Sequence, residues 1–152
     1  MADIRRIDTT QPPGPRMSRA VVYGNTVYLA GLTAGDTAQD IKGQTAQILE
    51  KIDHYLKEAG TSKSNLLTAN LWIKDMAMFR DMNSVWNEWV DPQNPPARAC
   101  VKAEMPARSS KSKQRQDSGR CSSRPWTARA MSSRQTWAIR PAFVRRRSAP
   151  PS

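Results

Sequence analysis

Recognisable strand and helix patterns end abruptly at Pro106 in this chain of 152 residues. Before that point, alternating and helically spaced apolar residues follow one another. After it, ten Ser and ten Arg stand among the last 46 residues, and the apolar residues follow neither a period of about 2 nor one of about 3.6. We therefore predict one folded domain over residues 1–106 and an irregular, basic Ser/Arg-rich tail over residues 107–152.

The excess positive charge lies entirely in that tail. The chain carries 24 Lys and Arg against 13 Asp and Glu, a formal net charge of +11. Twelve of the basic residues stand after residue 106, together with a single acid, Asp117. The domain keeps twelve residues of each sign and is neutral, so its charge gives no reason to expect nucleic-acid binding.

Two interpretations of the tail stay open. As an evolved segment it would be a basic arm that binds RNA or acidic partners. As the product of out-of-frame translation of GC-rich DNA it would have no selected role. The abrupt onset of Arg, Ser and Pro favours the second interpretation.

The first forty residues of the domain predict strands. Residues 4–7 alternate and predict a short strand, and a proline-rich loop follows. The runs Ser18–Tyr23 and Thr26–Ala30 are β-branched and aromatic, and Gly24-Asn25 separates them, which is typical of a hairpin. Residues 31–37 predict a polar loop.

Two amphipathic helices and two further strands follow. Asp40 is expected to cap a helix that runs to about Ala59, and Asp75 a second helix that ends before Asp91. The apolar stripe of the second helix consists of Met76, Phe79, Met82, Trp86 and Trp89. Leu66–Lys74 and Ala97–Ala103 predict the strands that follow the two helices.

This order of elements predicts an α+β fold. A mixed β-sheet would carry both helices on one face. The opposite face would then need a cover, which small subunits of this kind usually obtain by forming an oligomer.

Composition excludes several classes of protein. No run of eighteen apolar residues is present, so we expect no membrane span, and the first ten residues lack the apolar core of a secretory signal. Cys100 and Cys121 are too few for a disulfide framework, which favours a cytoplasmic location. With His54 as the one histidine, we expect no metal site and no Ser-His-Asp triad.

Four segments in order between Gly14 and Met105 resemble the RidA/YjgF family, also called L-PSP or endoribonuclease-like. They are residues 24–31 (GNTVYLAG), residues 44–52 (QTAQILEKI), residues 72–86 (WIKDMAMFRDMNSVW) and residues 95–101 (PPARACV). The resemblance implies a fold like that of bacillar chorismate mutase, a homotrimer with clefts between subunits, and no cofactor. It also implies an enzyme that hydrolyses 2-imino acids to 2-keto acids and ammonia.

The resemblance gives three residues a role. Arg98 matches the arginine that holds the substrate carboxylate, and a strand arginine offers a planar fork for that contact; a structural ion pair is the alternative. Cys100 lies two residues further, on the same side of the strand, where it lines the cleft or simply packs; we do not expect a nucleophile. Asn83 matches a helix asparagine that supports the cleft wall or makes a structural hydrogen bond.

Three features depart from the family pattern. Arg16 follows Gly14-Pro15 where active members often carry tyrosine, and Gly31 and Leu32 follow an alanine where many members have Ser-Gly-Gln. These three residues remain candidates for substrate binding, with Arg16 as a second anion-binding group. The family's final strand, which carries the glutamate that activates water, has no match after Met105. Positioned proton transfer is worth about 10²–10⁴ in rate, so we expect weak hydrolysis.

Three functions therefore remain in view. The first is hydrolysis of a 2-imino acid held by Arg98. The second is the endoribonuclease or translation-inhibitor activity attached to the family name, with nucleic acid bound through the tail. The third is a non-catalytic trimer that binds small carboxylates.

Overall fold

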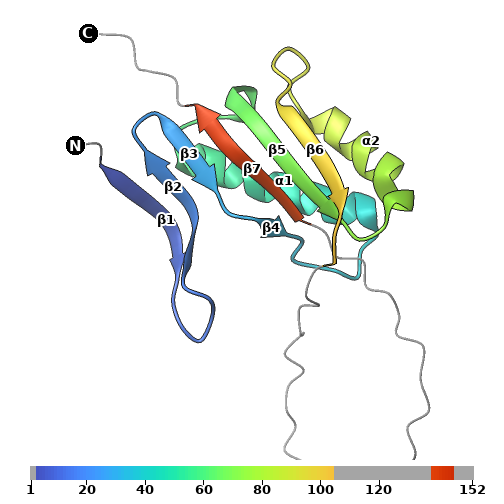
Figure 1. Ribbon diagram of the computed structural model, residues 1–152, viewed down its shortest axis with the longest axis horizontal. Coiled ribbons are helices and arrows are strands. Elements are labelled where there is room, and N and C mark those ends of the chain that lie inside the picture. The colour runs from blue at the N-terminus through green and yellow to red at the C-terminus, as the bar shows by residue number, and fades with distance from the viewer. Residues whose placement is uncertain (1–2, 105–137, 146–152) are drawn as a thin grey trace, which may run out of the picture.

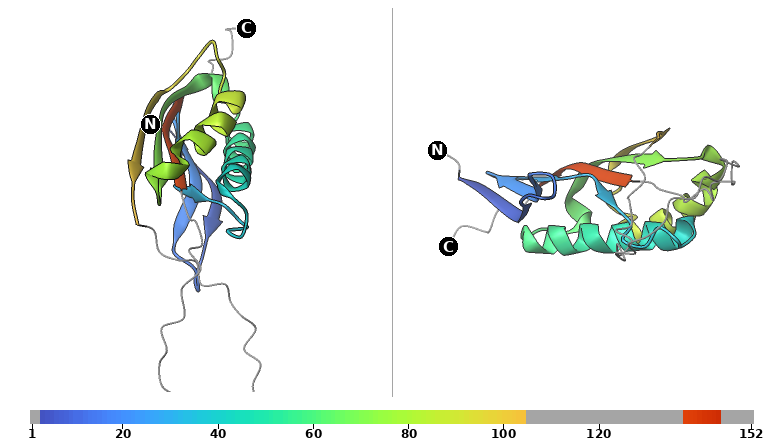
Figure 2. Two further views of the ribbon diagram at one scale, coloured as in Figure 1. Left: turned by 90° about the vertical axis from the view of Figure 1, so that its right-hand side faces the viewer. Right: turned by 90° about the horizontal axis from the view of Figure 1, so that it is seen from below.

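The computed structural model describes residues 3–104 and, for the backbone alone, residues 138–145. Their strands form one mixed sheet in the order β1-β2-β3-β7-β5-β6, with the short β4 paired to β7 (Figure 1). Both helices lie on one face of the sheet, as the two side views show (Figure 2). The predicted α+β architecture is confirmed. The elements are β1 Ile4–Thr10, β2 Met17–Tyr23, β3 Thr26–Leu29, β4 Leu32–Thr33, α1 Ile41–Glu58, β5 Leu66–Ile73, α2 Phe79–Trp89, β6 Ala97–Lys102 and β7 Ala138–Arg145, with short 3₁₀ turns at Lys63–Asn65 and Met76–Met78.

The predicted hairpin is present as β2 and β3. Ala20 pairs with Leu29 and Val22 with Val27, so these four side chains share the face that the helices cover. All four are at most 4% exposed. Gly24 adopts a φ of 56°, a conformation that the tight turn requires and that glycine takes without a steric penalty.

Helix α1 begins where its capping residue predicts. The Asp40 carboxylate accepts a hydrogen bond from the backbone N–H of Gly43 at 2.8 Å. Its buried stripe includes Ile48, Leu49 and Ile52, each at most 2% exposed. This stripe packs on the sheet and forms the centre of the core.

The second helix begins later than predicted. Asp75 accepts from the N–H of Ala77 at 3.0 Å, but it caps the 3₁₀ turn Met76–Met78, and α2 starts at Phe79. Met76 is consequently 45% exposed and lies outside the apolar stripe, whereas Met82 and Trp86 are buried. The extra turn explains the difference, because a 3₁₀ turn shifts residue 76 out of the helical phase.

Strands β5 and β6 run parallel and orient the residues of interest. Ala69 pairs with Arg98 and Leu71 with Cys100, and both β5 residues are buried on the helix-covered face. Arg98 and Cys100 therefore face the helices, on the same side as predicted. Val101 lies on the opposite face and is 49% exposed.

The expectation that no strand follows Met105 is wrong for residues 138–145. These residues form β7, which lies between β3 and β5 and also pairs with β4. Strands β3 and β5 both present backbone groups that need partners, and any extended segment can satisfy them regardless of its side-chain period. Pro141 contributes no N–H opposite Ala69, and the register shifts beside it. The rest of the predicted tail lies outside the described residues.

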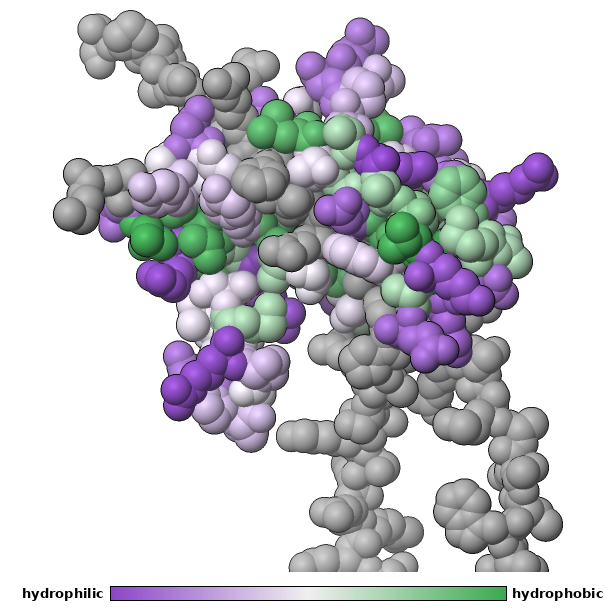
Figure 3. Space-filling view, in the orientation of Figure 1, coloured by the Kyte–Doolittle hydropathy of each residue, from purple (hydrophilic) through white to green (hydrophobic). Residues whose placement is uncertain are grey.

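The sheet face without helices is open in the single chain. Tyr28 is 38% exposed there and Val101 49%. The space-filling view of this face shows apolar groups set among polar ones (Figure 3). Among the described residues, no helix combines the length and the apolar character needed to cross a membrane.

Candidate functional site

Arg98 extends from β6 toward α2, on the helix-covered face of the sheet. Its side chain is exposed, and its Nη1 donates a hydrogen bond to Oδ1 of Asn83 at 2.8 Å. Asn83 is half-buried on α2. A neutral amide can orient a guanidinium without cancelling its charge, so the positive charge stays available to a ligand.

Two aromatic rings form the floor beneath the guanidinium. The Cζ of Arg98 lies 5.3 Å from the ring centre of Trp86 and 6.0 Å from that of Phe79. Phe79, Asn83 and Trp86 are spaced four and three residues apart, so one face of α2 presents all three. This contact favours the cation and holds its plane in place.

Cys100 lies two residues along β6 from Arg98 and is half-buried against the core. Burial raises the pKa of the Cys100 thiol, while the nearby charge of Arg98 acts in the opposite direction and is the weaker effect. The raised pKa keeps the protonated thiol dominant at neutral pH. Cys100 therefore packs against the core as a thiol of low reactivity and is not an activated nucleophile.

The alternative role for Arg98, a structural ion pair, finds no support among the described residues. Within residues 3–104, the ion pair that the structure contains joins Lys42 to Asp81. A guanidinium has five N–H donors, and the hydrogen bond that Arg98 makes within the described residues uses one of them. The planar guanidinium can donate two parallel hydrogen bonds to a carboxylate.

The other three candidates lie across the sheet from Arg98. Arg16 is exposed in the loop before β2, Gly31 is exposed between β3 and β4, and Leu32 is buried in β4 at 3% exposure. Strands β7 and β5 separate this edge from β6 in the strand order. A single chain thus brings together Arg98, Asn83 and Cys100 but does not bring Arg16, Gly31 or Leu32 to them.

Sequence reasoning missed the aromatic floor. The apolar stripe of the second helix predicts Phe79 and Trp86 to be core residues, and Trp86 is indeed 4% exposed. Their spacing around Asn83 was the available signal. It could not be used without knowing that β6 places Arg98 over this part of α2.

Comparisons with known proteins show the family and the fold to which this chain is similar. The family described as Endoribonuclease L-PSP matches residues 9–109. A RutC family protein of Haemophilus ducreyi is 39% identical over 102 residues, covering 67% of this chain and 84% of that protein. The RutC family protein YoaB of Escherichia coli is 36% identical over 90 residues, covering 59% and 78%. The crystal structure of NMB1025, a YjgF family member from Neisseria meningitidis, superposes with a TM-score of 0.72 at 30% identity, covering 97% of this chain and 98% of that one.

Proposed function

Because this chain belongs to the RidA/YjgF family, for which L-PSP and RutC are further names, we propose that it hydrolyses 2-imino acids to 2-keto acids and ammonia. The observation that supports this most is the Arg98 guanidinium. It is hydrogen-bonded to a neutral amide, rests on two aromatic rings and has no carboxylate partner among the described residues. Such a group is suited to gripping the carboxylate of a small organic acid.

The chemistry requires little beyond orientation. Water adds to the C2 carbon of the C=N bond and one of its protons goes to the nitrogen, which gives a carbinolamine. The nitrogen then takes up the hydroxyl proton, the C–N bond breaks as the C=O bond of the 2-keto acid forms, and ammonia leaves with the electron pair. Arg98 holds the carboxylate and so fixes the position of C2 beside Cys100. A held, oriented imine reacts with water faster than a free one.

We further propose that the site is completed between subunits of a homotrimer. Arg98, Asn83 and Cys100 lie at one end of the strand order, and Arg16, Gly31 and Leu32 lie toward the other. A neighbouring copy could present the second group to the first. The exposed apolar side chains of the open sheet face supply a surface for that association.

The rate is expected to be modest. Strand β7 contains no Asp or Glu (AIRPAFVR), so it brings no carboxylate to activate water. The rate is therefore expected to be about 10²–10⁴ times lower than that of a family member with a positioned acid-base residue. If hydrolysis falls to the uncatalysed level, the same site remains a binder of small carboxylates.

The test couples an amino-acid oxidase to the full-length protein and follows 2-keto acid formation. Arg98→Ala should lower kcat/KM by about 30-fold or more, because truncating one side of a charged hydrogen-bonded contact costs about 2–5 kcal/mol. Lys102→Ala, which removes a charge from the same side of the same strand, is the control and should change little. Equal rates of 2-keto acid formation with and without the wild-type protein would refute catalysis. Pyruvate is a 2-keto acid product and carries the same carboxylate, so pyruvate binding that survives Arg98→Ala would refute the assignment of the site to Arg98.

The match to the family described as Endoribonuclease L-PSP favours endoribonuclease activity as a second candidate. The neutral charge of residues 1–106 argues against strong RNA binding by the domain itself. Cleavage of RNA by the wild-type protein that persists in high salt would favour this second function.

A further inference from the structure

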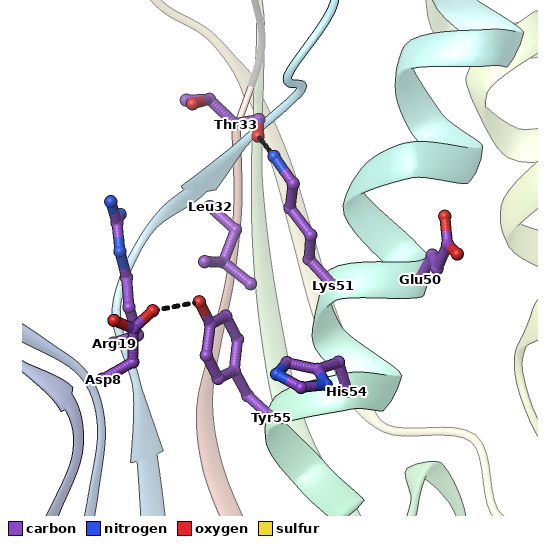
Figure 4. A pocket seen from close by; sticks show the side chains of 8 residues that line it. All are labelled: Asp8, Arg19, Leu32, Thr33, Glu50, Lys51, His54 and Tyr55. Carbon is purple, nitrogen blue, oxygen red and sulfur yellow. Dashed lines mark hydrogen bonds between the residues drawn. The ribbon is translucent and has the colours of Figure 1, made fainter. Parts of the chain in front are cut away.

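A second group of charged side chains converges between α1 and the β1–β2 strands, at the end of the sheet away from Arg98 (Figure 4). It lines a cavity of about 370 Å³. The lining residues are Asp8, Arg19, Leu32, Thr33, Glu50, Lys51, His54 and Tyr55. This volume is near the lower end of the range for small-molecule sites, which begins at about 300 Å³.

Asp8 is turned toward this cavity by an irregularity in β1. Ile7 pairs with Ala20 and Thr9 with Ser18, so Asp8 lies opposite Arg19 between two regular pairs. Its φ of 48° is in the left-handed region, and no other non-glycine residue of the described part has a positive φ. The Tyr55 hydroxyl donates to Oδ2 of Asp8 at 2.5 Å and so ties the carboxylate to α1. Such a conformation persists where its surroundings hold it, and it often marks a functional position.

Two cationic groups face the same cavity. Arg19 extends beside Asp8 but forms no ion pair with it, since the ion pair found in the described part is Lys42 with Asp81. The Nζ of Lys51 donates to the carbonyl oxygen of Thr33 at 2.8 Å, which holds β4 against the helix and keeps a second positive charge at the wall.

The balance of charge selects the kind of ligand. Arg19 and Lys51 stand against Asp8 and Glu50, so a simple anion meets two carboxylates and a simple cation meets two cations. A zwitterion can place its negative charge near the cationic side chains and its positive charge near the carboxylates, so that neither of its charges is repelled. It can also bridge Asp8 and Arg19, which lie opposite each other on β1 and β2 and form no ion pair in the described part of the chain.

We propose that this cavity binds a small zwitterion, an α-amino acid, with its carboxylate on Arg19 and its ammonium group on Asp8. The site is contained within one chain. Of the residues assigned to imine hydrolysis it contains Leu32 alone, and neither of the groups that would hold the zwitterion, Arg19 and Asp8, is among them.

The first experiment titrates the full-length, ¹⁵N-labelled protein with L-alanine and follows amide chemical shifts. Propionate and ethylamine serve as matched probes, because each keeps one of the two charges. Saturable shifts at Asp8, Arg19, Thr33 and Tyr55 are expected with L-alanine, with affinity at least tenfold above that of either matched probe. Propionate binding as tightly as L-alanine would overturn the proposal, as would shifts confined to other residues or absent.

The second experiment removes one charge at a time. Arg19→Gln and Asp8→Asn should each weaken L-alanine binding by roughly tenfold or more, the usual loss for a charged hydrogen bond. Asparagine tolerates a positive φ, so Asp8→Asn keeps the local backbone, and an unchanged amide spectrum elsewhere verifies this.

Arg6→Gln and Asp3→Asn are the matched controls, since both residues are exposed and outside the lining. Full affinity is expected in both controls and in Arg98→Ala. Unchanged binding in Arg19→Gln, or loss of binding in Arg98→Ala, would overturn the proposal.

Discussion

Arg98 and Arg19 are two guanidinium groups in contrasting surroundings. Arg98 is exposed on aromatic rings, with one neutral amide as its hydrogen-bond partner and no ion-pair partner among the described residues. Arg19 is half-buried in a cavity whose wall already carries both signs of charge. Under the function proposed above, the Arg98 site depends on groups from outside the chain, namely a ligand and a second copy. The Arg19 cavity is complete within one chain.

The largest expected effect comes from removing the strand that lies between the two sites. Deleting residues 138–152 leaves β3 and β5 without the backbone partner that β7 provides, so both sites should be lost with the fold. Thermal unfolding followed by circular dichroism should show no cooperative transition. The protein that lacks only residues 146–152 should keep its cooperative unfolding transition. Equal melting of the two truncated proteins would mean that β7 contributes nothing to the sheet.

The next effect separates the sites by oligomeric state. Val101→Glu places a charge on the open sheet face, where the residue is 49% exposed, and should dissociate the proposed trimer. Imine hydrolysis should be lost, while L-alanine binding at the Arg19 cavity should remain within about twofold. Light scattering after gel filtration gives the mass.

Lys102→Glu is the control for Val101→Glu, because the neighbouring residue points to the helix-covered face. It should leave the mass unchanged. A monomeric Val101→Glu protein that still hydrolyses imines would show that the Arg98 site needs no second copy.

A smaller effect is expected when Arg98 loses its orienting partner. Asn83→Ala removes the 2.8 Å hydrogen bond but leaves the aromatic floor, so KM should rise by about threefold to tenfold with little change in kcat. Asn87→Ala makes the same change one turn later, at an exposed position. A similar rise in KM for both variants would assign the effect to the helix and not to Arg98.

Short sequence patterns predict those parts of the fold that a few neighbouring residues determine. The Gly24 turn, the Asp40 cap and the stripe of α1 are each specified within a few residues, and the structure confirms them. The strand β7 was missed because its position depends on the vacant edges of β3 and β5, which lie far away in sequence. Its own side-chain pattern carries no strand signal.

The two sites were predictable to different degrees. A short motif and a two-residue spacing placed Arg98 and Cys100 on one side of a strand, and the register of β6 on β5 agrees. The contact of Arg98 with Asn83 depends on where α2 crosses, which no local pattern determines. The Arg19 cavity gave no sequence signal, because the left-handed conformation of Asp8 and its bond to Tyr55 join residues 47 positions apart.

The Asp8–Tyr55 hydrogen bond gives the Arg19 cavity a pH dependence in the alkaline range. Burial and the Asp8 carboxylate raise the pKa of Tyr55, and Arg19 partly opposes them. The folded state therefore holds the phenol proton more tightly than the unfolded state does. The contribution of Tyr55 to stability is full below a pH of about 10 and is lost as the pH rises through the pKa of the folded protein.

Tyr55→Phe should lower the unfolding free energy by about 0.5–1 kcal/mol at neutral pH and flatten its decline in alkali. Urea unfolding at a series of pH values measures both. Tyr23→Phe, at a tyrosine that is 50% exposed, is the control and should change neither. An alkaline decline that persists unchanged in Tyr55→Phe would remove the proposed coupling of Asp8 to α1.

The smallest effect tests whether the two sites are independent. Lys42 on α1 and Asp81 on α2 form an ion pair at 3.6 Å, with side chains 53% and 59% exposed, and it joins the helix of the Arg19 cavity to the helix of Asn83. An exposed pair of this kind is worth about 0–1 kcal/mol, so Lys42→Gln should lower stability by no more than that and leave both binding affinities nearly unchanged. Asp81 also lies in the first turn of α2, where a carboxylate favours the helix dipole. Asp81→Asn should therefore cost a few tenths of a kcal/mol more than Lys42→Gln, and double-mutant analysis separates the two contributions. A change in both affinities on breaking this pair would mean that the helices couple the sites, and the contrast between an open and a self-contained site would no longer hold.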